Sequence, residues 1–287
     1  MTRPTLEAAT AAVQRLPSLP RSTQQLLGYL NDESVELKII ERAIACDQGL
    51  AMAVLRIANS PFFGMSNRVQ TIHDAVVVLG FSNLRMIIVS AMTAMIQFPH
   101  LDQQATVRKL FRHSLSVAIS ASVIARNHAM DAANLFLAGI LHDVGILTLM
   151  STFPAQHASA RALAERENLF MFEAERQVFG FDHADIGASL CRHWNLPESI
   201  VQAIGGHHQI ASPQGTAQAL SPAELAAGTI HLADAIAHGL NLEGATDALV
   251  PPVSDLLWNR LSAGPHDLLA VFAETEKLYR ELELLLG

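Results

Sequence analysis

The spacing of the apolar residues limits the possible folds of this chain more than any other feature. Apolar side chains recur every three or four residues along almost the whole length, and alternating runs of β-branched residues are scarce. This spacing gathers apolar side chains on one face of an α-helix, whereas a half-buried strand needs a period of two. We therefore predict an all-α protein, with helices at about 22–31, 36–46, 49–58, 74–79, 83–96, 106–129, 132–150, 155–167, 172–179, 184–194, 197–208, 222–240 and 267–286.

A change in helix length suggests two parts. The helices before residue 99 are short, and Gly80 interrupts one of them. A polar segment follows at 99–104, and beyond it the helices lengthen and become rich in alanine and serine, which allows helices to approach closely. We predict an N-terminal helical bundle over 1–105 and a second helical domain, with a C-terminal helical extension, over 106–287.

Charge and hydropathy exclude several kinds of protein. The net charge is -8 and the chain has no run of Lys or Arg, so we do not expect direct binding to nucleic acid. The longest candidate membrane segment, from Met86 to Leu101, is shorter than the roughly 18 to 20 apolar residues that a spanning helix needs. The first residues lack the apolar stretch of a secretory signal. We expect a cytoplasmic protein that does not bind membranes.

The chain has 13 histidines, although only 16% of its residues are charged. Five segments between 113 and 238 place a histidine or an aspartate where the helical pattern calls for an apolar residue. The residues that we expect to form a site are His113, His142, Asp143, His183, His207, His208 and Asp234.

Each of these positions has a simpler interpretation when it is taken alone. A single buried histidine is more often a structural hydrogen-bonding group than a ligand. A buried carboxylate, however, is costly without a charged or metal partner, and Asp143 interrupts a strongly apolar segment. Imidazoles and carboxylates that converge in an apolar interior suit one divalent transition metal or a two-metal centre. We therefore predict that the seven residues share one site.

The order of these residues resembles a known signature. His113, the pair His142-Asp143 and the downstream Asp234 resemble the H...HD...D pattern of the HD superfamily of metal-dependent phosphohydrolases. His183 and the pair His207-His208 resemble the additional ligands of its two-metal branch. Four further segments, within residues 10 to 240, resemble the HDOD (HD-related output domain) family of bacterial signalling proteins: 16–20 (LPSLP), 44–64 ending in NSPFFG, 72–81 and 173–208.

The resemblance implies an N-terminal helical bundle followed by an HD-like bundle, used as an output or regulatory module. HDOD proteins commonly have degraded HD sites and no assigned hydrolase activity, whereas this chain keeps the full set of ligand-type residues. Ile146 stands where hydrolytic relatives commonly have lysine, so a cation for a substrate phosphate is absent there. The segment after His207-His208 lacks the Gly-Tyr-Pro block of the cyclic-di-GMP phosphodiesterase branch. Both differences favour metal binding over catalysis.

Three hypotheses follow. The first is a signalling module without catalytic residues, which binds Fe, Mn, Ni or Zn, with up to two ions and no organic cofactor, and whose partners are other signalling proteins. The second is a metal-dependent phosphohydrolase acting on a nucleotide or a cyclic dinucleotide. In it, His113, His142, Asp143 and Asp234 hold one metal, while His183, His207 and His208 complete a second site or bind phosphate. The third is a purely structural histidine cluster in a partner-binding scaffold.

Overall fold

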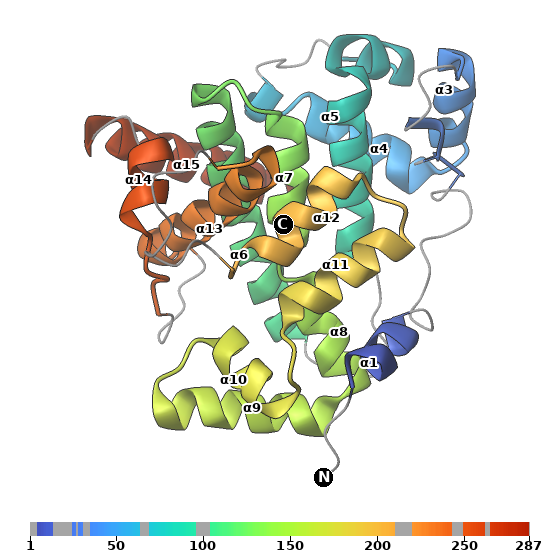
Figure 1. Ribbon diagram of the computed structural model, residues 1–287. Helices are drawn as coiled ribbons and strands as arrows, with labels where there is room; N and C mark the ends of the chain where they lie inside the picture. Colours follow the sequence, from blue (N-terminus) through green and yellow to red (C-terminus); the bar gives the residue numbers. More distant parts are fainter. Residues whose placement is uncertain are drawn as a thin grey trace.

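The computed structural model describes residues 5–13, 25–26, 28–30, 35–63, 69–95, 104–209, 220–242, 249–261 and 265–286. Every regular element within these ranges is a helix, which confirms the all-α prediction (Figure 1). The segment 16–20 and the start of the helix expected at 22–31 lie outside the described residues.

The helices at the start of the chain are short except for α5, and specific side-chain bonds fix their ends. They are α1 (Leu6–Val13), α3 (Leu37–Ala45), α4 (Gln48–Ala58), the 3-10 helix η1 (Pro61–Phe63) and α5 (Ile72–Met95). The Asp47 carboxylate caps α4 by accepting from the Leu50 amide at 3.0 Å. Asn59, at the end of α4, exchanges hydrogen bonds with both backbone groups of Val69. Gly80 has a φ of 71° and breaks α5 where the sequence predicted an interruption.

The remaining helices follow residue 103, and among them α6 packs against α7, α13 and α15 near the middle of the molecule (Figure 1). In chain order they are α6 (Gln104–Asn127), α7 (Ala132–Leu141), α8 (Val144–Thr152), α9 (Pro154–Glu167), α10 (Met171–Val178), α11 (His183–His193), α12 (Glu198–Gly206), α13 (Pro222–Leu240), α14 (Asp255–Leu261) and α15 (Pro265–Leu286). Helices α1 and α14 were not predicted from the sequence.

The continuous helix predicted at 132–150 is wrong. Helix α7 ends at Leu141, the chain turns at His142 and Asp143, and α8 begins at Val144. The turn lies inside the molecule, since His142 is 1% exposed and Asp143 is 9% exposed. In a continuous helix, successive side chains point about 100° apart, so one face could not direct both residues to the same site. The break between α7 and α8 therefore allows both polar side chains to face the interior.

The helices that carry this turn lie unusually close to their neighbours. A Cβ on Gly139 of α7 would lie 2.5 Å from the Cα of Ala118 on α6. A Cβ on Gly145 of α8 would overlap the backbone carbonyl of His183 at the start of α11. The buried residues of α6 include Ser114, Ser116, Ser120 and Ser122, which are small enough for this packing. Glycine and small residues therefore set the distances between the helices around the turn.

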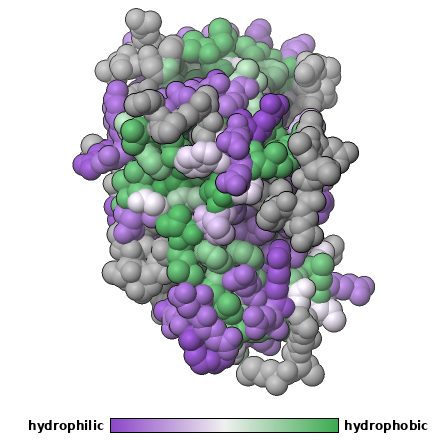
Figure 2. Space-filling view, turned by 60° about the vertical axis from the view of Figure 1, so that its left-hand side comes forward, coloured by the Kyte–Doolittle hydropathy of each residue, from purple (hydrophilic) through white to green (hydrophobic). Residues whose placement is uncertain are grey.

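One helical stretch among the described residues, Ala132–Thr152, is long and apolar enough to cross a membrane, with a mean hydropathy of 1.6. Its apolar window is 72% buried inside the molecule, and the turn at His142 and Asp143 divides it, so it belongs to the core. The lower end of the molecule, where α9 and α10 lie, has a mainly hydrophilic surface (Figures 1 and 2).

Replacing Gly145 with alanine is expected to destabilise the protein by about 2 kcal/mol or more, because the new methyl group would overlap the His183 carbonyl. The matched control is Gly239→Ala on α13, where a Cβ meets no atom within 4 Å. That change is expected to raise stability by up to about 1 kcal/mol, since alanine favours a helix over glycine. Urea unfolding of both variants measures the difference, and equal stabilities would contradict the packing described for α8 and α11.

Candidate metal centre

Five parts of the chain bring the seven predicted residues together in the interior. His113 comes from the middle of α6, and His142 and Asp143 come from the turn between α7 and α8. Asp182 caps α11, accepting from the Asp185 amide, and places His183 in the first turn of that helix. The other members follow the end of α12 or lie on α13: His207, His208 and Asp234.

One half of the cluster is built around Asp234. The His113 Nε2 atom lies 2.9 Å from Asp234 Oδ1, and these two residues are 121 positions apart in the chain. His142 Nε2 lies 4.0 Å from the same carboxylate oxygen and 3.3 Å from Asp143 Oδ2. The candidate ligand atoms of His113, His142 and Asp143 all lie within 4.8 Å of one another, a spacing that could hold a metal ion.

The other half is formed by His183, His207 and His208, whose candidate ligand atoms also lie within 4.8 Å of one another. His183 Nε2 is 2.8 Å from His208 Nε2 and 3.1 Å from Asp143 Oδ1. Asp143 therefore turns one carboxylate oxygen toward each half of the cluster. Such a carboxylate is suited to bridging two metal ions.

Two histidines have their ring orientation fixed by the backbone. The Nδ1 atom of His142 lies 2.8 Å from the Gly139 carbonyl, and that of His207 lies 2.6 Å from the Ile204 carbonyl. A carbonyl only accepts, so both Nδ1 atoms carry the proton. Both Nε2 atoms are buried and have no hydrogen-bond partner among the described residues. Their lone pairs point into a polar site, which costs free energy unless a cation is bound there.

Glu175 of α10 is a site residue that the sequence analysis missed. Its side chain is fully buried, and Oε2 accepts from the His183 amide at 2.9 Å and lies 2.6 Å from His183 Nδ1. A carboxylate behind a histidine fixes the ring and makes its other nitrogen a stronger ligand. No pattern marked this residue, because α10 also carries the acidic Glu173 and its periodicity is that of an ordinary amphipathic helix.

Two more histidines lie at the edge of the cluster. His238 Nε2 lies 3.3 Å from Asp234 Oδ1, and His238, His113 and Asp234 form a third group with metal-ligand spacing. His238 is not among the ligands predicted from the sequence. His231 has a structural role, because its two ring nitrogens lie 3.0 and 2.9 Å from the carbonyls of His207 and Pro252.

The electrostatic environment keeps both carboxylates ionised and His207 neutral, whereas at His183 the Glu175 and Asp143 carboxylates outweigh burial and raise the pKa well above its usual value. Burial opposes ionisation of Asp143, but His142 and His183 hold its pKa well below the usual value. Burial also opposes ionisation of Asp234, but the hydrogen bond and charge of His113 outweigh it and lower the carboxyl pKa. Burial, together with the charges of His142 and His183, lowers the pKa of His207 to about 3. Ionised carboxylates and neutral imidazoles are the forms that bind divalent metals.

The clusters among the described residues have the spacing of a metal site. A model of the HDOD domain family matches residues 16–210. An HDOD domain protein of unknown function from Geobacter sulfurreducens is 25% identical and superposes with a TM-score of 0.67, covering 95% of this chain and 98% of that one. A protein from Shewanella amazonensis, named as a candidate phosphohydrolase, is also 25% identical, with a TM-score of 0.64 and coverage of 93% and 98%.

A relative known from its sequence is longer. A protein of unassigned function from Treponema pallidum is 25% identical over 81% of this chain, and the match covers 46% of that protein. The chain thus spans about half the length of this relative.

The metal-free protein is expected to lose stability through His207 as the pH falls from about 6.5 toward 3. The folded-state pKa lies below the unfolded value of 6.5, so the unfolded chain binds the proton first and the stabilisation present above pH 6.5 is lost on acidification. The pKa of His183 is raised on folding, so its protonation stabilises the folded protein as the pH falls and offsets part of the loss from His207. The contribution of His207 is therefore measured as the difference between the wild-type protein and a His207 variant. Urea unfolding in EDTA should show that the free energy of unfolding falls less on acidification in His207→Asn than in the wild-type protein. The asparagine amide can still donate to the Ile204 carbonyl. An equal or larger loss in the variant would contradict this account.

Proposed function

The chain belongs to the HDOD domain family, and on that premise we propose that it is an output or regulatory module of bacterial signal transduction built around a divalent-metal site. In this proposal it acts in the cytoplasm on other signalling proteins. The N-terminal bundle over 1–105 and the HD-like domain over 106–287 are the two parts of the module.

One observation carries the metal site. The Nε2 atoms of His142 and His207 are buried without a hydrogen-bond partner among the described residues, while their Nδ1 atoms are held by backbone carbonyls. A purely structural histidine cluster would be expected to use its ring nitrogens in hydrogen bonds.

We assign the metal ligands by their places in the two halves of the cluster. His113, His142, Asp143 and Asp234 would hold one ion, and His183, His207 and His208 a second, with Asp143 available to both. Imidazole and carboxylate ligands suit Fe, Mn, Ni or Zn. Glu175 would act through His183 by holding its ring.

The same ligand set supports a second candidate function, that of a metal-dependent phosphohydrolase acting on a nucleotide or a cyclic dinucleotide. Two adjacent ions bound here would supply Lewis acidity and an activated water molecule. This candidate ranks second because Ile146 stands where hydrolytic relatives commonly carry lysine, and because the Gly-Tyr-Pro block is absent after His208. Because the similar Shewanella protein is named as a candidate phosphohydrolase, this second function is tested directly below.

Metal content tests the proposed site. Protein produced with added Mn, Fe, Ni or Zn is expected to hold between one and two ions per chain by elemental analysis. His142→Ala and His207→Ala are each expected to lower that content, because each removes an Nε2 ligand. His73→Ala is the control, since His73 is exposed on α5 and pairs with Glu41 far from the cluster. Metal-free protein after supplementation, or the same loss in all three variants, would contradict the assignment.

Hydrolysis separates the two candidate functions. With each metal bound, the protein is expected to cleave no member of a panel of nucleotides and cyclic dinucleotides at an enzyme-like rate of about 1 per second or more. Product formation at such rates, abolished in His142→Ala and retained in His73→Ala, would instead establish the phosphohydrolase.

A further inference from the structure

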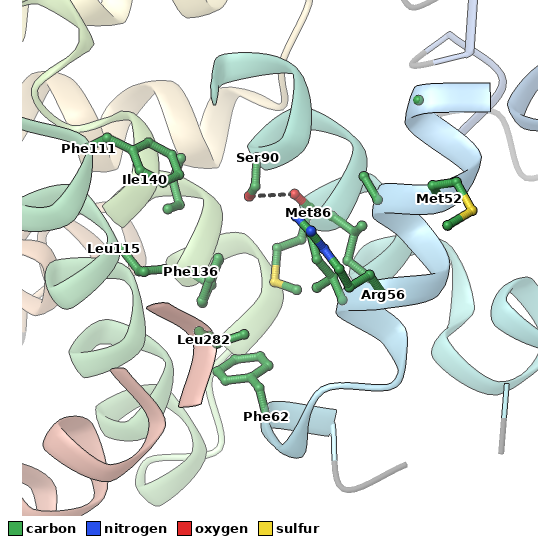
Figure 3. Close-up of a pocket in the computed structure, with 14 residues that line it drawn as sticks. Met52, Arg56, Phe62, Met86, Ser90, Phe111, Leu115, Phe136, Ile140 and Leu282 are labelled. Carbon is green, nitrogen blue, oxygen red and sulfur yellow. Dashed lines mark hydrogen bonds between the residues drawn. The ribbon is translucent and has the colours of Figure 1, made fainter. Parts of the chain in front are cut away.

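A second feature of the molecule lies apart from the metal centre. A partly open cavity of about 420 Å³ is lined by α4 and α5 on one side and by α6, α7 and α15 on the other (Figure 3). None of the candidate metal ligands lines it. Its volume falls in the range of about 300 to 1,000 Å³ that small-molecule sites span, near the lower end. The cavity is therefore large enough for a small organic ligand.

The walls of the cavity are almost entirely apolar. Phe62 of η1 packs against Phe136 of α7 with ring centroids 5.1 Å apart, and Leu282 of α15 lies beside them (Figure 3). Phe62 belongs to the NSPFFG segment that stood out in the sequence. The residues that line the cavity include one charged side chain, Arg56, and one hydroxyl, that of Ser90. Many apolar groups with a few polar ones are typical of ligand sites.

Arg56 sets the charge that an occupant would carry. It is exposed on α4 and, in Figure 3, points from that helix toward α5. No carboxylate of the described residues forms an ion pair with it. The Ser90 hydroxyl already donates to the Met86 carbonyl at 2.7 Å, so Arg56 supplies the available donors. A guanidinium pairs best with a planar carboxylate through two parallel hydrogen bonds, and a single cation matches a single negative charge.

We propose that this cavity binds a medium-chain carboxylic acid, with its carboxylate on Arg56 and its hydrocarbon chain between Phe62, Phe136 and Leu282. The apolar walls would bury the methylene groups, which contribute most of the affinity. The single cation would select the carboxylate over a neutral or dianionic head group.

The cavity and the candidate metal centre share two helices but no residue. Phe111 and Leu115 line the cavity and lie two residues before and after His113 on α6. Ile140 of α7 lines it two residues before His142. Two residues along a helix correspond to about 200°, so the cavity and the metal ligands lie on opposite faces of the same helices. A ligand there would contact the helices that carry His113 and His142 without touching a candidate metal ligand.

Calorimetric titration with sodium decanoate, below its micelle concentration, tests the proposal. One equivalent is expected to bind saturably. Sodium octanoate should bind about 15-fold more weakly, because each methylene contributes roughly fourfold in affinity. Decan-1-ol, which has the same chain but no charge, should bind about tenfold more weakly than decanoate. Absence of saturable binding, or equal affinity for decanoate and decan-1-ol, would overturn the proposal.

Variants locate the site. Arg56→Gln is expected to weaken decanoate about tenfold and to leave decan-1-ol unchanged, because only the charge pair is lost. Arg42→Gln, an exposed arginine on α3 outside the cavity lining, is the control and should change neither. Ala53→Phe should fill the space and abolish binding of both probes, with thermal unfolding used to verify that it folds. Unchanged binding in Arg56→Gln would overturn the proposal even if Ala53→Phe does not fold.

Discussion

The burial of two carboxylates, Asp143 and Asp234, is the constraint on which this architecture depends. An ionised carboxyl group cannot lie in an apolar interior without compensation. The compensation here comes from histidines on separate helices: His113 beside Asp234, and His142 and His183 on either side of Asp143. These helices must therefore approach within a few ångströms of one another. Glycines at 139 and 145 and serines along α6 allow that approach, so the apolar core and the polar cluster require the same packing.

The rings of His142 and His207 are oriented so that Nε2 can act as a ligand. Backbone carbonyls fix the Nδ1 protons of His142 and His207, and a fully buried glutamate, Glu175, fixes His183. The Nε2 atoms consequently face the interior of the cluster. This orientation of the rings is the one expected of metal ligands, whereas both ring nitrogens of His231 lie against backbone carbonyls.

The helical period and the residues that interrupt it predicted the fold class, most helices and the convergence of the seven polar residues. The break at His142 and Asp143 was missed because the apolar pattern continues across it, and only the burial of both side chains shows why the helix must end there. Glu175 and the position of His238 depend on contacts between distant helices, which a local pattern does not encode. The cavity beside Arg56 was missed for the same reason, since five helices and η1 contribute to its walls.

The central claim is that the two halves of this cluster bind metal through Asp143. Anomalous diffraction from crystals grown with Mn or Zn, recorded at the absorption edge of that metal, tests it most directly. We expect anomalous density beside Asp143, within coordination distance of Nε2 of His142 or His207. Density confined to surface histidines, with the cluster filled only by water hydrogen-bonded to those Nε2 atoms, would contradict the account.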